Sequence, residues 1–92
     1  MNVVFDFGEN RHVRLLIHSL KRESFEIIDA SYILTKKGAD TPEADGISNI
    51  NEHIIDTIIS PKEMGEYDLK VTYHIADETL IENIGVLVLW VD

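Results

Sequence analysis

Four histidines, His12, His18, His53 and His74, are the residues of this sequence best suited to metal chemistry. Imidazole nitrogens bind zinc or copper when several of them converge on one ion. His12 and His18 fall on one face of an expected strand, but extended chain between them spans roughly 20 Å, too far for a shared ion. The sequence also lacks a closely spaced pair such as H-x-H or HExxH. We therefore expect solvated histidines and no metal site.

Acidic and hydroxyl side chains give no stronger indication of a site. Asp40, Glu43 and Asp45 could offer oxygen ligands to calcium, although their spacing departs from the D-x-D-x-D-G loop. The serines do not stand in a G-x-S-x-G nucleophile elbow, and no glycine-rich phosphate loop is present. We therefore expect a protein that is not an enzyme, with no catalytic residue and no cofactor.

The charge balance limits the classes of partner. The 92 residues include 17 acidic and 8 basic side chains, which give a net charge of −9. Tight binding to nucleic acid takes on the order of 6 to 10 phosphate contacts, and the 8 basic side chains are scattered among about twice as many acidic ones. We therefore expect no nucleic-acid partner. The same charge disfavours anionic membranes. No cysteine is present, which excludes disulfides and thiolate metal sites.

Length and hydropathy favour one domain that is not membrane-bound. A chain of 92 residues fits a single domain, 1–92, with one core. No apolar run approaches the roughly 18 residues that a membrane-spanning helix requires. The first ten residues lack the basic region and long apolar run of a signal peptide. We therefore expect a cytoplasmic protein.

The stretch that organises the expected fold is Gly65–Ile75. Every second residue from Tyr67 to Ile75 is apolar, and the residues between them are polar. This alternation is typical of a strand with one face on a core and the other in water, as in layered antiparallel folds.

Similar alternation predicts the other strands. An edge strand is expected over residues 3–7, and further strands over 11–19 and 25–36. Within 25–36 the even positions are predicted to face the core: Ile28, Ala30, Tyr32 and Leu34. The final strand is expected over 79–91, after a tight hairpin at 76–78.

The middle of the chain is less regular. Residues 37–46 have the composition of a solvent loop, and we expect mobility there. Residues 48–60 allow a helix or strands. We favour strands, because isoleucine is β-branched and because Ile55, Thr57 and Ile59 alternate with Asp56 and Ser60.

About seven short strands without a clear helix favour an all-β, antiparallel sandwich of two sheets. The run MGEYDLKVTY resembles the penultimate strand of immunoglobulin-like domains, which opens with Gly-x-Tyr. The resemblance implies an immunoglobulin-like β-sandwich in which Gly65 and Tyr67 form a structural corner, the tyrosine bonding back to upstream backbone. Leu69 stands where antibody domains have a cysteine, and Tyr32 or Leu34 would replace their tryptophan.

The acidic, cysteine-free chain also resembles the small immunoglobulin-like proteins of phages and prophages. This likeness implies a structural or protein-interaction module within a phage or prophage assembly, so a virion is the alternative location to the cytoplasm. Two other functions stay open. A carbohydrate-binding module would need exposed aromatic rings, and a small hydrolase would need converging polar groups in a pocket.

The final strand carries the candidate interface. Almost every residue from Ile84 to Val91 is apolar, so one core cannot satisfy both faces of the strand. We assign Val86, Val88 and Trp90 to the core, and Leu87, Leu89 and Val91 to a second face. Either Gly85 introduces a bulge that turns the strand, or the second face is covered. Exposed apolar patches mark association sites, and we therefore expect a protein partner, or self-association, through this C-terminal strand.

Overall fold

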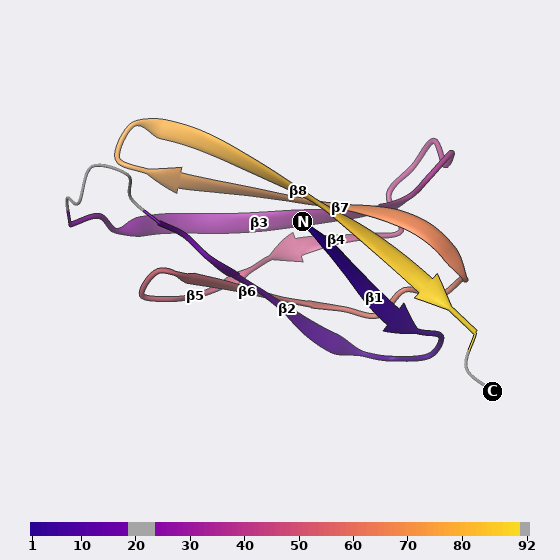
Figure 1. Ribbon diagram of the computed structural model, residues 1–92. Coiled ribbons are helices and arrows are strands. Elements are labelled where there is room, and N and C mark those ends of the chain that lie inside the picture. Colours follow the sequence, from indigo (N-terminus) through magenta and orange to yellow (C-terminus); the bar gives the residue numbers. More distant parts are fainter. Residues whose placement is uncertain (19–23, 91–92) are drawn as a thin grey trace.

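The computed structural model describes residues 1–18 and 24–90, and strands are the regular elements there. The strands of the described residues are β1 (Asn2–Asp6), β2 (Arg11–Leu16), β3 (Ile27–Lys36), β4 (Ala44–Ile47), β5 (Asn49–Asn51), β6 (Ile54–Ile59), β7 (Gly65–Ile75) and β8 (Glu78–Leu89). They form a five-stranded sheet, β1-β8-β7-β3-β4, and a three-stranded sheet, β2-β6-β5 (Figure 1). The predicted all-β class with two sheets is confirmed. The described ranges contain no helix long and apolar enough to cross a membrane.

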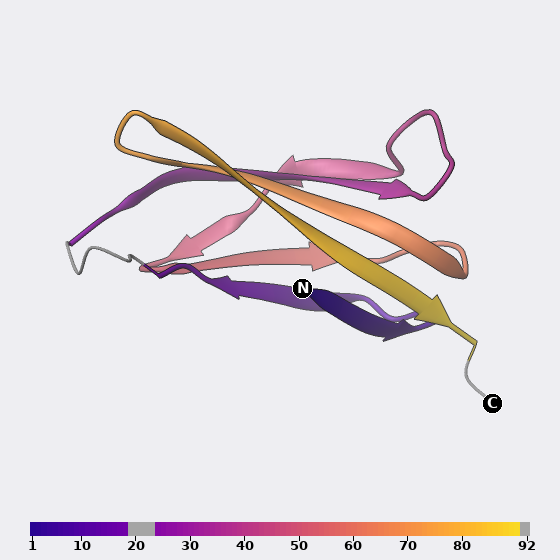
Figure 2. The same ribbon diagram turned by 45° about the horizontal axis from the view of Figure 1, so that its top comes forward.

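The two sheets lie against each other as the layers of a sandwich (Figure 2). Apolar side chains from both layers fill the space between them. The largest that are fully enclosed are Phe5, Leu34, Ile55, Leu69 and Ile84. Burying an aliphatic or aromatic side chain of this size contributes about 1.5 to 3 kcal/mol. The short edge strands β4 and β5 add no fully buried residue to this core.

Strand β7 has the bounds and the two faces that the sequence predicts. Tyr67, Leu69, Val71 and Tyr73 are buried, and the polar residues between them point outward. The strand pairs antiparallel with β8 along one edge and with β3 along the other. Its backbone is therefore hydrogen-bonded on both sides, which places it at the centre of the five-stranded sheet.

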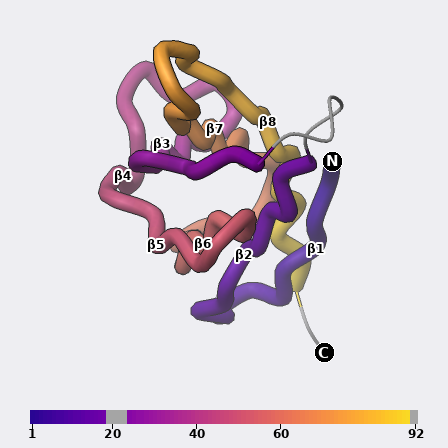
Figure 3. Tube along the Cα trace, turned by 90° about the vertical axis from the view of Figure 1, so that its left-hand side faces the viewer, coloured from indigo at the N-terminus to yellow at the C-terminus, as the bar shows by residue number. Residues whose placement is uncertain are grey.

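Strand β1 lies at the sheet edge, as predicted, but its pairing is parallel. Val3 lies opposite Val86 and Phe5 opposite Val88, and the two strands run in the same direction. Figure 3 shows β1 beside β8 at one side of the sandwich. The expectation of a wholly antiparallel sandwich is therefore wrong. The turn after β1 leads to β2 in the other sheet, so β1 forms no hairpin and pairs with the last strand instead.

Strand β3 follows the predicted pattern except at its start. Ala30 and Leu34 are buried and Tyr32 is half-buried, in agreement with the even face. Ile28 was assigned to the core, but it is 59% exposed, and Ile27 is buried in its place. The register with β7 shifts between Ile27 and Asp29. This irregularity changes which residues face inward, because one inserted residue reverses the alternation of a strand.

The middle of the chain forms strands rather than a helix. β5 and β6 occupy the ambiguous stretch, and Ile55, Thr57 and Ile59 are buried as the strand interpretation requires. The preceding loop is shorter than predicted, because β4 begins at Ala44 and pairs with β3.

Strand β8 ends at Leu89, and Val91 lies outside the described residues. Val86 and Val88 are buried as predicted, but the assignment of Trp90 to the core is wrong, since its side chain is 65% exposed. Trp90 follows Leu89, the last paired residue of the strand. Gly85 keeps an unbroken register with both neighbouring strands, so it introduces no bulge.

A buried pair of hydroxyls joins the two sheets where the chain passes from β4 to β5. The Ser48 backbone N–H donates to the Ala30 carbonyl oxygen of β3 at 3.0 Å. The Ser48 and Thr57 hydroxyl oxygens lie 2.7 Å apart, and both residues are buried. Ser48 therefore bonds one sheet with its backbone and the other with its side chain.

We expect Thr57→Val to lower the free energy of unfolding by about 1 to 3 kcal/mol, because the Ser48 hydroxyl would lose its partner in a dry environment. The double variant Ser48→Ala/Thr57→Val removes both groups and should be clearly less destabilised than the single variant. Urea denaturation of the three proteins measures this difference. Equal losses in the single and double variants would contradict the coupling.

Candidate functional site

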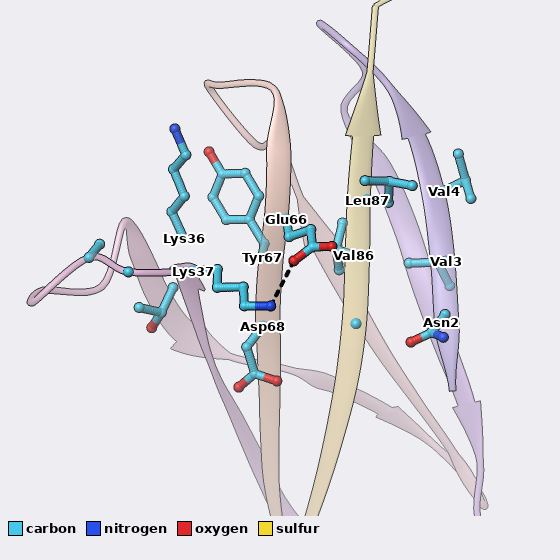
Figure 4. A pocket seen from close by; sticks show the side chains of 14 residues that line it. Asn2, Val3, Val4, Lys36, Lys37, Glu66, Tyr67, Asp68, Val86 and Leu87 are labelled. Atoms are coloured by element: carbon cyan, nitrogen blue, oxygen red, sulfur yellow. Dashed lines mark hydrogen bonds and ion pairs between the residues drawn. The ribbon is translucent and has the colours of Figure 1, made fainter.

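A groove of about 780 Å³ lies on the outer face of the five-stranded sheet (Figure 4). It crosses β1, β8, β7 and the end of β3, and the start of the following loop lines it as well. Its lining consists of Asn2, Val3, Val4, Thr35, Lys36, Lys37, Gly38, Ala39, Glu66, Tyr67, Asp68, Gly85, Val86 and Leu87. Ligand sites in proteins usually occupy about 300 to 1,000 Å³, so the groove has the volume of a binding site.

Two rows of residues across the strands shape this groove. In the first row Asn2 lies opposite Gly85, and Gly85 lies opposite Asp68. In the second row Val4 and Glu66 flank Leu87 in the same way. Glycine leaves the first row low at its centre, whereas the second row carries side chains throughout. The groove therefore has a floor at Gly85 and a wall at Leu87.

Gly85 leaves room for the Asn2 side chain at the floor of the groove. A Cβ atom at this position would lie 2.4 Å from Oδ1 of Asn2, so the Asn2 side chain would have to move. The Gly85 N–H also donates to the carbonyl oxygen of Met1 at 3.0 Å. The start of the chain is thus held against β8 at the groove.

The two ends of the groove differ in chemistry. Val4 and Leu87 make the end over β1 and β8 aliphatic, and both side chains are exposed. The end over β7 and β3 is charged. There the Lys37 ammonium lies 3.0 Å from Oε2 of Glu66, while Asp68 has no ion-pair partner within the described part of the chain. The groove is therefore apolar at one end and carries an unneutralised carboxylate at the other.

Tyr67 and Gly65, the expected corner, lie at the start of β7. Gly65 has a φ of 114°, a value that favours glycine. The Tyr67 hydroxyl accepts a hydrogen bond from the Glu63 N–H at 3.1 Å and donates one to Oε1 of Glu43 at 2.8 Å. The other oxygen of Glu43 accepts from the Lys62 N–H at 3.2 Å. The Glu43 and Tyr67 side chains together thus join the β3–β4 loop to the turn before β7.

The pKa of Tyr67 reflects this environment. Burial raises the pKa of the phenol to about 12, and the hydrogen bond to the Glu43 carboxylate adds to the increase. The bond from the Glu63 N–H acts in the opposite direction. Burial also raises the pKa of Tyr73.

The histidines lie in separate places. His12 contacts Asp56 at 2.8 Å, and His74 contacts Asp29. The His53 ring stacks on Phe25 with their centroids 4.0 Å apart. The described residues contain no group of three or more side chains arranged to hold a metal ion. Of the acidic loop residues considered for calcium, Glu43 is engaged by Tyr67 and Lys62.

The candidate interface residues Leu87 and Leu89 are both exposed, while Val91 lies outside the described residues. The sequence did not indicate two features near them. Val4 lies opposite Leu87, and Trp90 packs against Phe7 with ring centroids 5.6 Å apart. Val4 could have been noticed in the sequence as an apolar residue on the outward face of an alternating strand. That Leu87 is its neighbour follows from the parallel β1–β8 pairing, which the sequence did not reveal.

Comparisons of the chain with models of protein families, with curated proteins and with solved structures found no match.

We expect Tyr67→Phe to lower the free energy of unfolding by about 1 kcal/mol, because the Glu63 N–H and the Glu43 carboxylate both lose a partner. Urea denaturation midpoints measure the loss. Tyr73→Phe is the matched control, since the Tyr73 hydroxyl has no hydrogen-bond partner among the described residues. A midpoint that is unchanged by Tyr67→Phe would show that this corner does not stabilise the domain.

The raised pKa of Tyr67 also predicts a pH dependence. The phenol ionises near pH 10 in the unfolded chain and at about 12 in the folded one, so the folded state holds the proton more tightly between these values. The resulting stabilisation is complete below pH 10 and is lost as the pH rises towards 12. The difference in stability between the wild type and Tyr67→Phe should therefore shrink over this range. A constant difference in alkaline urea titrations would contradict the assignment.

Proposed function

We propose that this domain is an immunoglobulin-like module that acts by contacting another protein chain, without catalysis. The strand order supports the fold type. Immunoglobulin domains place their third, sixth and seventh strands in one sheet and their second, fourth and fifth in the other, and variable-type domains add a strand beside the third. With β4 as that added strand, β3, β7 and β8 occupy the first sheet, and β2, β5 and β6 the second.

The observation that carries the proposal is a continuous aliphatic surface on a regular sheet. Val4 is 53% exposed, Leu87 37% and Leu89 46%. Val4 lies opposite Leu87 across the β1–β8 pairing, and Leu89 follows on the same face of β8. Exposed apolar patches beside polar rims are typical of protein interaction sites. We call these three residues the β1–β8 patch.

The chemistry of the groove supports a non-catalytic role. The ionisable residues that line it are Lys36, Lys37, Glu66, Tyr67 and Asp68. Lys36 and Lys37 form ion pairs with Glu63 and Glu66. The Tyr67 hydroxyl is engaged by Glu43 and the Glu63 backbone. Among the described residues that line the groove there is no serine, cysteine or histidine, and the pKa of the Tyr67 phenol is raised to about 12, which disfavours the activated nucleophile that a small hydrolase would need.

The assembly that we propose for the module is a phage or prophage particle. Its support is the resemblance of the acidic, cysteine-free chain to small immunoglobulin-like virion proteins. Capsid or tail genes beside the gene for this chain would add to that support, and a location among unrelated metabolic genes would count against it.

We expect Leu87→Glu to abolish association through the β1–β8 patch, because it buries a charge in the contact, while the fold survives at this exposed position. Sedimentation velocity measures self-association, and capture with the immobilised domain measures binding to other proteins. Ile58→Glu is the matched control, since Ile58 is comparably exposed on β6 of the other sheet. Binding that is equal in the wild type and both variants would contradict the proposal.

A carbohydrate-binding module is the second candidate, because one observation favours it. Trp90 is largely exposed beside Phe7, and the two rings are tilted by 32°. Exposed aromatic faces can stack on sugar rings. Quenching or a blue shift of Trp90 fluorescence during titration with simple oligosaccharides would support this function, and Phe7→Ala should weaken the response. Unchanged fluorescence across a glycan panel would contradict it.

A further inference from the structure

The groove beside the β1–β8 patch combines two recognition elements at a short distance. Leu87 and Asp68 are diagonal neighbours across β8 and β7, since Leu87 lies opposite Glu66 and Asp68 opposite Gly85. Diagonal neighbours in an antiparallel pair are about 7 to 8 Å apart, within reach of one long side chain. The other two corners of this quartet are Gly85, which has no side chain, and Glu66, which pairs with Lys37 (Figure 4).

We propose that the groove receives a lysine or arginine side chain from a basic surface of a partner protein. This inference rests on the proposed interaction function. The aliphatic stem lies on Val4 and Leu87, and the cationic head pairs with the Asp68 carboxylate. Lysine and arginine are suited to this site because each carries an apolar stem and a charged end.

The charge around the groove favours this occupant. Glu66 is already neutralised by Lys37 at 3.0 Å, so Asp68 is the carboxylate left to bind a cation. A guanidinium or ammonium group at Asp68 would gain a charge-assisted hydrogen bond. An acidic side chain would meet an unpaired carboxylate, and a purely apolar one would leave Asp68 partly covered without a partner.

The charge of the whole chain favours a different protein over a second copy. With a net charge of −9, two copies repel each other at long range, whereas a basic partner is attracted and steered towards contact. The groove also offers no lysine to a second copy's Asp68, because Lys36 and Lys37 are paired with Glu63 and Glu66. The partner's contacting surface is therefore basic.

The proposal can be tested by titrating the ¹⁵N-labelled protein with three short synthetic peptides, acetyl-Leu-Lys-Leu-amide and its forms with Gln or Glu at the centre. The Lys peptide should shift the amide resonances of Asp68, Gly85 and Leu87. The Gln and Glu peptides should give much smaller shifts. Asp68→Asn should weaken binding of the Lys peptide by about two- to five-fold, the range for a single exposed ion pair.

Asp77→Asn is the matched control, because it removes the same charge from the turn between β7 and β8, away from the groove. It should leave binding of the Lys peptide unchanged. Equal weakening by Asp68→Asn and Asp77→Asn would overturn the proposal, since the peptide would then follow net charge alone. Shifts scattered over the acidic surface would overturn it as well.

The outcome can be separated from that of the proposed function. If Leu87→Glu abolishes association with a protein but the Lys peptide does not bind the groove, the interaction function stands and this inference is wrong. If the Lys peptide binds at Asp68 but association does not depend on Leu87, the groove binds a lysine side chain while the proposed contact through the β1–β8 patch is wrong. Self-association of the wild type that blocks the peptide would overturn the choice of a basic partner.

Discussion

The parallel pairing of β1 with the second half of β8 is the interaction on which both the core and the groove depend. It places Phe5 between the sheets, where its side chain is fully buried. Arg11 covers this edge from β2, with its guanidinium 4.3 Å from the centre of the Phe5 ring and Nη2 donating to the Val4 carbonyl oxygen at 2.6 Å. The first strand is therefore tied to both sheets, although it is short and lies at an edge.

The same pairing creates the outer surface. Residues of β1 alternate between the two faces, so the strand that buries Phe5 must present Val4 outward, opposite Leu87. Without β1, Leu87 would border an open sheet edge, and such edges invite uncontrolled pairing with other chains. With β1 in place, the backbone of β8 is covered from Gly85 to Leu89. Contact with a partner then occurs through side chains of the sheet face rather than through backbone hydrogen bonds.

Local alternation was sufficient to predict the elements whose two faces differ clearly. The strand over 65–75 follows its sequence, because apolar residues at every second position can satisfy only one arrangement. The stretch 48–60 allowed a helix or strands, and its β-branched isoleucines favoured the strands that form there. Ile28 was misplaced because the register shift near it depends on pairing with β7, a contact that is distant in sequence. Trp90 was misplaced for a related reason: its side chain continues the apolar alternation past the point where the partner strands end.

Only part of the candidate site could be predicted from the sequence. Leu87 and Leu89 stood out because a strand with two apolar faces cannot bury both in one core. Val4, Gly85 and Asp68 did not stand out, since their importance comes from lying in adjacent rows of three strands. Sequence spacing describes one strand at a time. A surface made by neighbouring strands requires the sheet order, which the alternation pattern does not contain.

The groove and the core are linked through consecutive residues of β7. Glu66 and Asp68 face the groove, while Tyr67 between them points inward and bonds Glu43 and the Glu63 backbone. Packing and hydrogen bonds at Tyr67 therefore fix the direction in which its two neighbours project. Lys37 is held on the opposite side in a similar way, because its N–H donates to the Glu66 carbonyl oxygen at 2.9 Å while its ammonium pairs with the Glu66 side chain. The carboxylate of Asp68 thus stands on a rigid strand between two anchored residues, so ordering it for a ligand requires little further loss of conformational entropy.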